Sequence, residues 1–133
     1  MSDLINKDQG ELIKYLVGRD SAIAIPKPFE RDIYLFDTFV AGTTHIEDIE
    51  IIEPSINKGD KLVFYREADN PHDPQAILIE TVNGEKIGYV PRQDNIIFSR
   101  LMDAGKSIFG KVIEKEQRGK WLKIKIKIYL HES

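Results

Sequence analysis

The stretch that decides the fold is residues 66–92, READNPHDPQAILIETVNGEKIGYVPR. Its polar beginning separates the apolar segments 61–67 and 75–82, and Asn83-Gly84 then folds the chain back. An Asn-Gly pair between apolar runs is a strong signal for a β-hairpin. The hairpin returns residues 88–92 to the polar turn, so we expect the two ends of the stretch to form a small binding pocket.

The side-chain directions in this hairpin follow from its expected register. With Asn83-Gly84 at the tip, Thr81 lies opposite Lys86 and Leu78 lies opposite Tyr89, and opposed residues share a face of the sheet. One face then carries Ile77, Ile79, Gly88 and Val90, and the other carries Leu78, Ile87 and Tyr89. Tyr89 is therefore expected to point away from the main core, either into a pocket beside the polar turn or onto a minor apolar cluster.

Composition limits the class of protein. The 133 residues suffice for one compact domain with an appended helix, and the content of 41% hydrophobic and 31% charged residues is typical of globular proteins. No apolar run approaches the roughly 20 residues of a membrane span, no export signal opens the chain, and cysteine is absent. We therefore expect a cytoplasmic protein without membrane association, disulfides or thiolate metal sites. The net charge of -3 argues against a surface that coats DNA nonspecifically, but it allows a small pocket for one strand end.

The first 30 residues are expected to stand apart from the rest. Residues 2–17 have apolar side chains at helical spacing, and Gly18 can end the helix. Pro26 and Pro28 then impose extended backbone, as in a linker or arm. We therefore divide the chain into an N-terminal helix with its arm (1–30) and a domain (31–133). The helix can pack on its own domain, or it can join copies of the chain into a homo-oligomer.

The domain is expected to be mainly β. Aromatic and β-branched content, alternation and turn residues predict about six antiparallel strands, at 33–41, 61–67, 75–82, 85–90, 107–115 and 120–130. Residues 46–52 fit a short helix better than a strand, and residues 94–104 have helical spacing with Gly105 as the stop. Short strands joined by turns predict a small β-barrel of the OB or SH3 type with one or two inserted short helices.

The polar turn allows two interpretations. Asn and Asp side chains stabilise turns by bonding to nearby backbone, and Pro71 and Pro74 rigidify it, so the turn can be purely structural. The same rigid presentation of an amide, carboxylates and an imidazole also suits recognition of a hydroxyl or a sugar edge.

Two sequence blocks carry a family resemblance. They are Asn70-Pro71-His72-Asp73-Pro74-Gln75-Ala76 and Ile87-Gly88-Tyr89-Val90-Pro91-Arg92. Preceded by Val40-Ala41-Gly42 and Gly59-Asp60-Lys61-Leu62, they occur in the order seen in the HIRAN domain, which residues 36–133 resemble. The resemblance implies a modified small β-barrel that binds single-stranded DNA. In members fused to DNA translocases, the domain recognises a free three-prime end during replication-fork remodelling.

The resemblance also implies which residues bind the strand. Asp73 corresponds to the aspartate that meets the ribose hydroxyl, and Asn70 corresponds to the amide before it. Tyr89 occupies a contact position, and Arg92 takes the place of the basic residue that holds phosphate. From these correspondences we expect a single-stranded DNA-binding module with a role in DNA repair or replication-fork processing.

His72 and His45 are departures from the family pattern, because they stand where the family has aromatic rings that stack on the terminal base. Imidazole offers less stacking area than tyrosine, and stacking is worth about 1–3 kcal/mol per base. The two histidines are therefore expected to weaken binding or to change the ligand. With Asp73 they also make an acceptable ligand set for zinc or manganese, if their loops share one rim.

Other classes of function stay open. The sequence has no Gly-rich phosphate loop, nucleophile elbow or metalloprotease helix, so we do not expect an enzyme. One alternative is an oligomeric scaffold that binds proteins without nucleic acid. Another is a metal-dependent phosphohydrolase, acting on an acid anhydride or a phosphoester, in which Glu67, Asp69 and Asp73 hold the ion.

A stripe of three lysines lies on the last expected strand, at Lys123, Lys125 and Lys127, with Trp121 nearby. Ile124, Ile126 and the other apolar residues alternate with them and define the buried face. The stripe either follows a phosphate backbone or is a solvated face that protects a sheet edge from aggregation.

Overall fold

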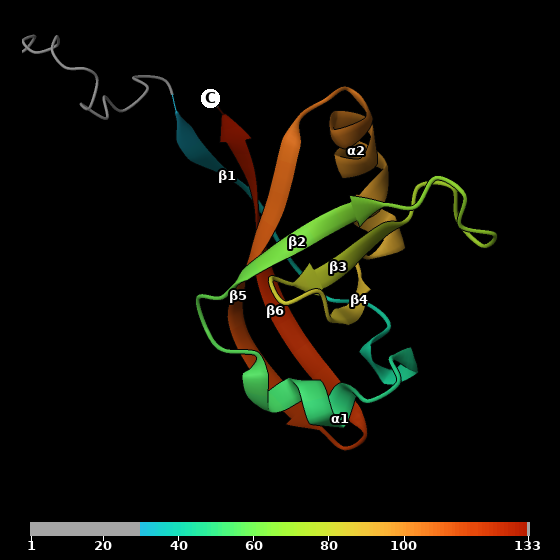
Figure 1. The fold of residues 1–133 in the computed structure, drawn as a ribbon, viewed down its shortest axis with the longest axis vertical. Helices are drawn as coiled ribbons and strands as arrows, with labels where there is room; N and C mark the ends of the chain where they lie inside the picture. The colour runs from blue at the N-terminus through green and yellow to red at the C-terminus, as the bar shows by residue number, and fades with distance from the viewer. Residues whose placement is uncertain (1–29, 133) are drawn as a thin grey trace, which may run out of the picture. The chain divides into compact units, whose positions relative to one another are not determined.

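The computed structural model describes residues 30–132. Six strands form one antiparallel sheet in the order β1-β6-β5-β2-β3-β4. The strands are β1 (Arg31–Phe39), β2 (Lys61–Arg66), β3 (Ile77–Thr81), β4 (Lys86–Tyr89), β5 (Ser107–Arg118) and β6 (Trp121–Glu132). In Figure 1 the β2–β3 pair runs across the long β5–β6 pair, so the sheet is strongly curled. The mainly β fold with six antiparallel strands is confirmed.

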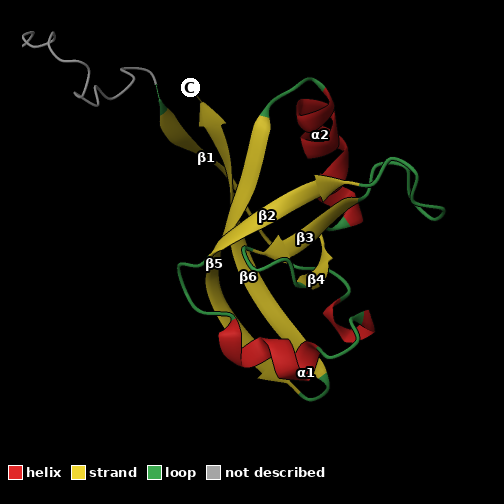
Figure 2. Cartoon of the chain, viewed as in Figure 1, coloured by secondary structure: helices red, strands yellow, loops and turns green. Residues whose placement is uncertain are grey.

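The helices are short, and along the chain α1 comes between β1 and β2 and α2 between β4 and β5 (Figure 2). They are α1 (Ile49–Ile52), flanked by the 3-10 turns Thr43–His45 and Glu53–Ser55, and α2 (Arg92–Asp103). None of the helices in residues 30–132 has the length and hydropathy that a membrane span needs. The helix expected at residues 2–17, and any oligomer contact through it, lie outside the described residues. The expected division at residue 30 likewise stays a prediction.

The sheet curls into a half-barrel whose edges meet at one point, so the expected barrel-like fold is confirmed in this coarser form. Within the described residues, the edge strands β1 and β4 are joined by one bridge, between Ala41, just past β1, and Tyr89. Two backbone hydrogen bonds of 2.8 and 2.9 Å hold this bridge. Gly88 permits the close approach, because a Cβ there would lie 2.5 Å from Cγ1 of Val40 and would collide with the carbonyl oxygen of Ala41. Its φ of 152° also favours glycine.

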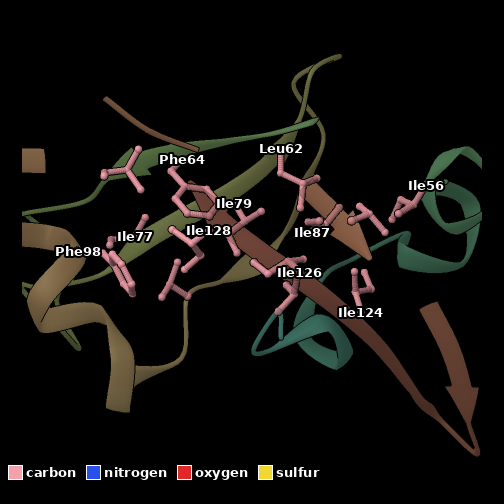
Figure 3. Close-up of a cluster of buried hydrophobic side chains, with 14 of the residues drawn as sticks. Ile56, Leu62, Phe64, Ile77, Ile79, Ile87, Phe98, Ile124, Ile126 and Ile128 are labelled. Carbon is pink, nitrogen blue, oxygen red and sulfur yellow. The ribbon is translucent and has the colours of Figure 1, made fainter. Parts of the chain in front are cut away.

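The core fills the inner face of the curled sheet. Ile124, Ile126 and Ile128 of β6 are fully buried, whereas Lys125 between them is exposed, as the alternation predicts. Figure 3 shows these isoleucines with buried side chains from β2, β3 and α2. α2 contributes Phe98, whose ring centroid lies 5.8 Å from that of Phe36 on β1. Packing on this face therefore fixes α2, and with it the segment that leads from β4 into the helix.

The tip of the β3–β4 hairpin differs from the expected register. The loop comprises residues 82–84 rather than Asn83-Gly84 alone, and a 2.9 Å bond from the backbone N–H of Thr81 to the carbonyl of Glu85 closes it. Gly84 has a φ of 86°, which is typical of a three-residue hairpin loop that ends in a left-handed residue. Lys86 consequently pairs with Glu80, and the predicted pairing of Thr81 with Lys86 is wrong.

A bulge at Ile87 then restores the register. The pairing shifts between Glu80 and Ile79, so that Leu78 lies opposite Tyr89 as predicted. The extra residue on the bulged strand bends it, and Ile87 becomes fully buried in the main core. Its predicted place on the outer face is therefore wrong, while Tyr89 keeps its place on that face.

Candidate functional site

A pocket of ≈ 530 Å³ lies where the polar turn meets the end of the hairpin. Its walls come from the segment after β1 (Ala41, Gly42) and from the polar turn (Asn70, His72, Asp73, Ala76). The end of β4, the residue after it and the first turn of α2 complete them (Tyr89, Val90, Arg92, Asn95). The volume falls in the range of about 300–1,000 Å³ found for ligand sites. The structure thus brings together five of the six predicted site residues.

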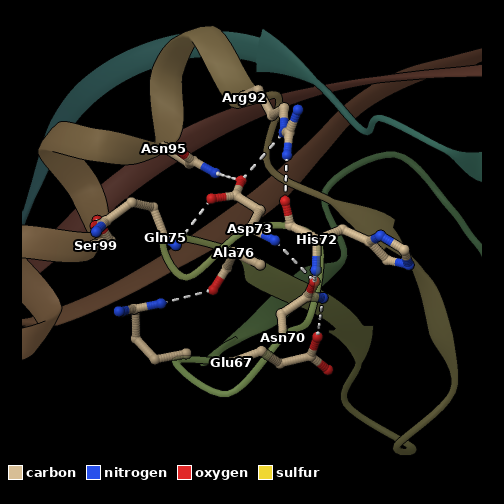
Figure 4. Close-up of polar contacts among 10 residues, drawn as sticks. Glu67, Asn70, His72, Asp73, Gln75, Ala76, Arg92, Asn95 and Ser99 are labelled. Carbon is tan, nitrogen blue, oxygen red and sulfur yellow. Dashed lines mark hydrogen bonds and ion pairs between the residues drawn. The ribbon is translucent and has the colours of Figure 1, made fainter.

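Asn70 shapes the turn. Its side-chain oxygen accepts hydrogen bonds from the backbone N–H groups of His72 (2.8 Å) and Asp73 (3.1 Å), and its amide nitrogen donates to Oε1 of Glu67 at 3.0 Å (Figure 4). An Asx turn of this kind mimics a backbone turn and fixes its course. Asn70 therefore positions its neighbours, because both ends of its amide are engaged within the protein.

Asp73 stands at the centre of the site. Its Oδ1 accepts from the backbone N–H of Gln75 at 2.9 Å, and its Oδ2 accepts from Nδ2 of Asn95 at 2.8 Å and lies 3.5 Å from Nε of Arg92. The hydrogen bond from Asn95 is the main cause that lowers the pKa of Asp73, followed by the bond from Gln75, while partial burial opposes them and Arg92 adds to the lowering. The carboxylate is thus charged at neutral pH. Since a carboxylate has about four lone-pair sites, it retains the capacity to accept one further donor.

Arg92 links the turn to α2. Its guanidinium donates to the carbonyl oxygen of His72 and contacts Asp73, yet the side chain is 73% exposed. A guanidinium has five N–H donors in a planar fork, so donors remain for an anion at the mouth of the pocket.

Tyr89 is held by Glu67. The phenol donates to Oε1 of Glu67 at 2.8 Å, the same oxygen that receives the amide of Asn70. Burial is the main cause that raises the pKa of Tyr89, and the neighbouring Glu67 raises it further. The phenol therefore stays protonated at neutral pH. Its hydroxyl is engaged, which leaves the half-buried ring as its contact surface.

Two residues that the sequence analysis missed support the site from α2. Asn95 is 2% exposed and holds Asp73, and Ser99 is fully buried and donates to Oε1 of Gln75. A signal was present, because Asn95 and Ser99 are four residues apart beside the buried Phe98 and so share the inner side of the helix. Buried polar side chains need hydrogen-bond partners, and the polar turn supplies them.

Arg66 holds the other side of the turn. It donates to the carbonyl oxygens of Ala76 (2.8 Å) and Pro74 (3.1 Å), and its Nε pairs with Asp103 of α2 at 2.9 Å. The turn is thus attached to β2 and to both ends of α2, and the pocket is preformed.

His45 is the predicted site residue that lies apart. It is exposed on the turn Thr43–His45, and the lining of the pocket does not include it. Within residues 30–132, His, Asp and Glu side chains form no group of three that could hold a metal ion. The sets proposed from sequence, around His72 and Asp73 or around Glu67 and Asp73, are therefore not assembled as metal sites in the described part of the chain.

Solved structures share this fold. A crystal structure of a protein from Lactobacillus plantarum matches with a TM-score of 0.73 at 25% identity, over 78% of this chain and 99% of that one. The crystal structure of the HIRAN domain of human HLTF matches with a TM-score of 0.60 at 18% identity, over 77% and 80% of the two chains. The NMR structure of the HLTF HIRAN domain in its DNA-bound conformation gives 0.51 at 17% identity, over 74% and 78%.

Sequence comparison points to the same family. Helicase-like transcription factor is 29% identical over 77 residues in Mus musculus and 28% identical over 74 residues in Oryctolagus cuniculus. Each match spans 56% of this chain but 7% of the relative. The family model of the HIRAN domain matches residues 33–133. The chain therefore belongs to the HIRAN domain family.

Proposed function

We propose that this domain binds single-stranded DNA at or near a free three-prime end, and that the end enters the pocket between the polar turn and α2. The observation that carries the proposal is the convergence of an aromatic ring, a charged carboxylate and an exposed guanidinium on one preformed pocket. The HLTF member of the family has been solved in a DNA-bound conformation, which supports nucleic acid as the ligand class.

Each group has a distinct task in this proposal. The ring of Tyr89 stacks on the terminal base, and the exposed imidazole of His72 adds a second surface at the rim. Asp73 accepts a hydrogen bond from the terminal hydroxyl, since its Oδ atoms have unused acceptor capacity. Arg92 binds the phosphate that precedes the terminal nucleotide. Asn70 acts indirectly, by holding the turn.

His45 has a different place in the proposal. His45 is exposed at the end of the turn that follows Gly42, and Gly42 lines the pocket. We assign it to a base further along the strand, outside the pocket. Its substitution should therefore affect longer oligonucleotides more than very short ones.

Charge favours an end over the middle of a strand. A strand that continued past Asp73 would place another phosphate beside this carboxylate, and two like charges at close range repel. A terminal hydroxyl meets the same carboxylate as a hydrogen-bond donor. An end-binding module of this kind suits DNA repair or replication-fork processing, where free ends are exposed.

The test compares oligonucleotides that differ only at the three-prime end. Fluorescence anisotropy should show tighter binding to a free three-prime hydroxyl than to a three-prime phosphate. Arg92→Gln should weaken binding to the free end, while Arg100→Gln, which removes the same charge from an exposed position on the same helix, should leave the hydroxyl preference intact. Equal affinity for the two ends, whether tight or negligible, would overturn the proposal.

A further inference from the structure

The outer face of the sheet carries a row of three lysines that directly oppose one another. Lys61 of β2 pairs with Lys111 of β5, and Lys111 pairs with Lys127 of β6. We call these residues the lysine row. Like charges directly opposite each other on neighbouring strands are destabilising. A row of this kind on three successive strands is therefore a cost to the fold.

Neighbouring lysines on β6 are arranged differently. Lys125 lies opposite Glu114 and pairs with it at 3.9 Å, and Lys123 lies opposite Glu116, which also pairs with Arg118 at 3.1 Å. Lys123 and Lys125 thus face carboxylates on β5 and are the compensated lysines of the stripe, whereas Lys127 faces Lys111 on that strand.

No member of the lysine row forms an ion pair with the residues that the structure describes. Asp37 is the cross-strand neighbour of Lys127 and accepts the hydroxyl of Tyr34 at 2.8 Å, but it forms no ion pair with Lys127. Lys61 and Lys111 have lysines as their cross-strand partners between β2, β5 and β6. The positive charge of the row is therefore available to an anion.

Aromatic rings hold the ammonium groups of the row in place. The Nζ atoms of Lys61, Lys111 and Lys127 lie 4.8, 5.2 and 5.3 Å from the ring centroids of Phe109, Tyr129 and Tyr34. The rings also contact one another, with centroids 5.4 Å apart for Phe109 and Tyr129 and 6.0 Å apart for Tyr34 and Tyr129. Cation–π contacts of this kind are favourable at exposed sites. They present the charges as an ordered array.

The row shares its face with the pocket. Tyr89, Leu78 and Tyr65 are successive cross-strand neighbours on β4, β3 and β2. Tyr65 is 48% exposed, and it lies on the same face of β2 as Lys61, because the two are an even number of residues apart. Tyr65 and Tyr89 therefore lie on the same face of the sheet as the lysine row, on either side of the buried Leu78.

We propose that the lysine row binds the phosphate backbone of the single strand whose end occupies the pocket. This inference rests on the proposed function for its ligand class. It adds a second contact surface on β2, β5 and β6. A single strand matches this surface, since its phosphates are evenly spaced negative charges that can follow the sheet across successive strands.

Salt dependence measures the contact. Each phosphate engaged on a single strand contributes a slope of about 0.7 to the fall of log K with log salt. The double variant Lys111→Gln/Lys127→Gln should therefore reduce the slope by about 1.4. If the electrostatic contribution to binding vanishes near about 1 M salt, this corresponds to roughly 25-fold weaker binding at about 0.1 M salt. Lys123→Gln/Lys125→Gln removes the same charge from the compensated lysines and should change the slope much less. Lys111→Arg/Lys127→Arg should retain it, and circular dichroism of each variant checks folding.

Two single strands of DNA distinguish binding by the lysine row from binding by the pocket. The first is a linear thymidine strand of about 15 nucleotides, near the upper site size of a single OB fold, and the second is a circular single strand, which has no end for the pocket. The reduced slope should appear with both. An unchanged slope with both strands, or no binding to either, would overturn the role of the row. A reduced slope on the circle, without any preference for a three-prime hydroxyl on the linear strand, would retain the row and reject the end pocket.

Discussion

Replacement of Asn95 by alanine tests how the site is held together. The Asn95 side chain is 2% exposed and donates to Oδ2 of Asp73 at 2.8 Å. Hydrogen bonds to charged groups contribute about 1.5–3 kcal/mol to stability. Asn95→Ala leaves Oδ2 with Arg92 alone, at 3.5 Å on an exposed side chain. We therefore expect the free energy of unfolding to fall by about 1.5–3 kcal/mol near neutral pH.

The loss should depend on pH in a defined direction. The pKa of Asp73 is lowered in the folded protein, chiefly by Asn95. Ionised Asp73 therefore contributes stability above its unfolded pKa of about 3.9, and this contribution is lost as the pH falls through the folded pKa. Asn95→Ala removes part of the contribution. The difference in stability between the two proteins should be full near pH 7 and should narrow below about pH 4.

Urea unfolding at a series of pH values, followed by the fluorescence of Trp121, measures this difference. Other carboxyls with a lowered pKa, such as Asp103 beside Arg66, titrate in both proteins and cancel. Gln93→Ala is the matched control, since Gln93 is exposed on the same helix and its loss should stay within about 0.5 kcal/mol. A difference for Asn95→Ala below that value, or one that does not change with pH, would refute the reasoning.

Three further predictions concern the pocket. Gly88→Ala should destabilise the domain by about 1–3 kcal/mol more than Gly84→Ala, as measured by urea unfolding. Both glycines have positive φ, but only a Cβ at Gly88 would collide with Ala41, and equal losses would contradict this steric difference. Tyr89→Ala should weaken oligonucleotide binding by about 1–3 kcal/mol, whereas Tyr89→Phe, which keeps the ring and loses the bond to Glu67, should bind nearly as well; anisotropy decides between stacking and hydrogen bonding. His72→Tyr restores the aromatic ring of the family pattern on an exposed side chain and should tighten oligonucleotide binding. Weaker binding of the variant would show that residue 72 is not a stacking surface here.

The hairpin shows how a sequence prediction can be correct in part. Asn83-Gly84 correctly placed the turn, and Leu78 does pair with Tyr89. The loop, however, takes in Val82, and the one-residue shift that follows is cancelled by the bulge at Ile87. Apolar alternation cannot locate such a pair of shifts, because the two shifts cancel and leave the far end of the hairpin in the predicted register.

The site was predictable where residues are close in the chain or share a motif. The Asn70 turn and the return of Tyr89 and Arg92 toward it followed from turn chemistry and the hairpin. Asn95 was missed, because its role depends on how α2 packs against the core, and His45 was placed in the site by family correspondence although its turn lies outside the pocket. The spacing of Asn95 and Ser99 indicates a shared helix face, but local spacing does not say that this face meets the polar turn.

The most direct test of the central claim is a titration of the isotopically labelled protein with a single strand that has a free three-prime hydroxyl, followed by two-dimensional NMR. We expect the amide signals of five pocket residues to shift together: Asn70, His72, Asp73, Tyr89 and Arg92. A strand with a three-prime phosphate should shift them less at the same concentration. Shifts confined to other surfaces, or identical shifts with the two strands, would contradict the claim that this pocket binds a strand end.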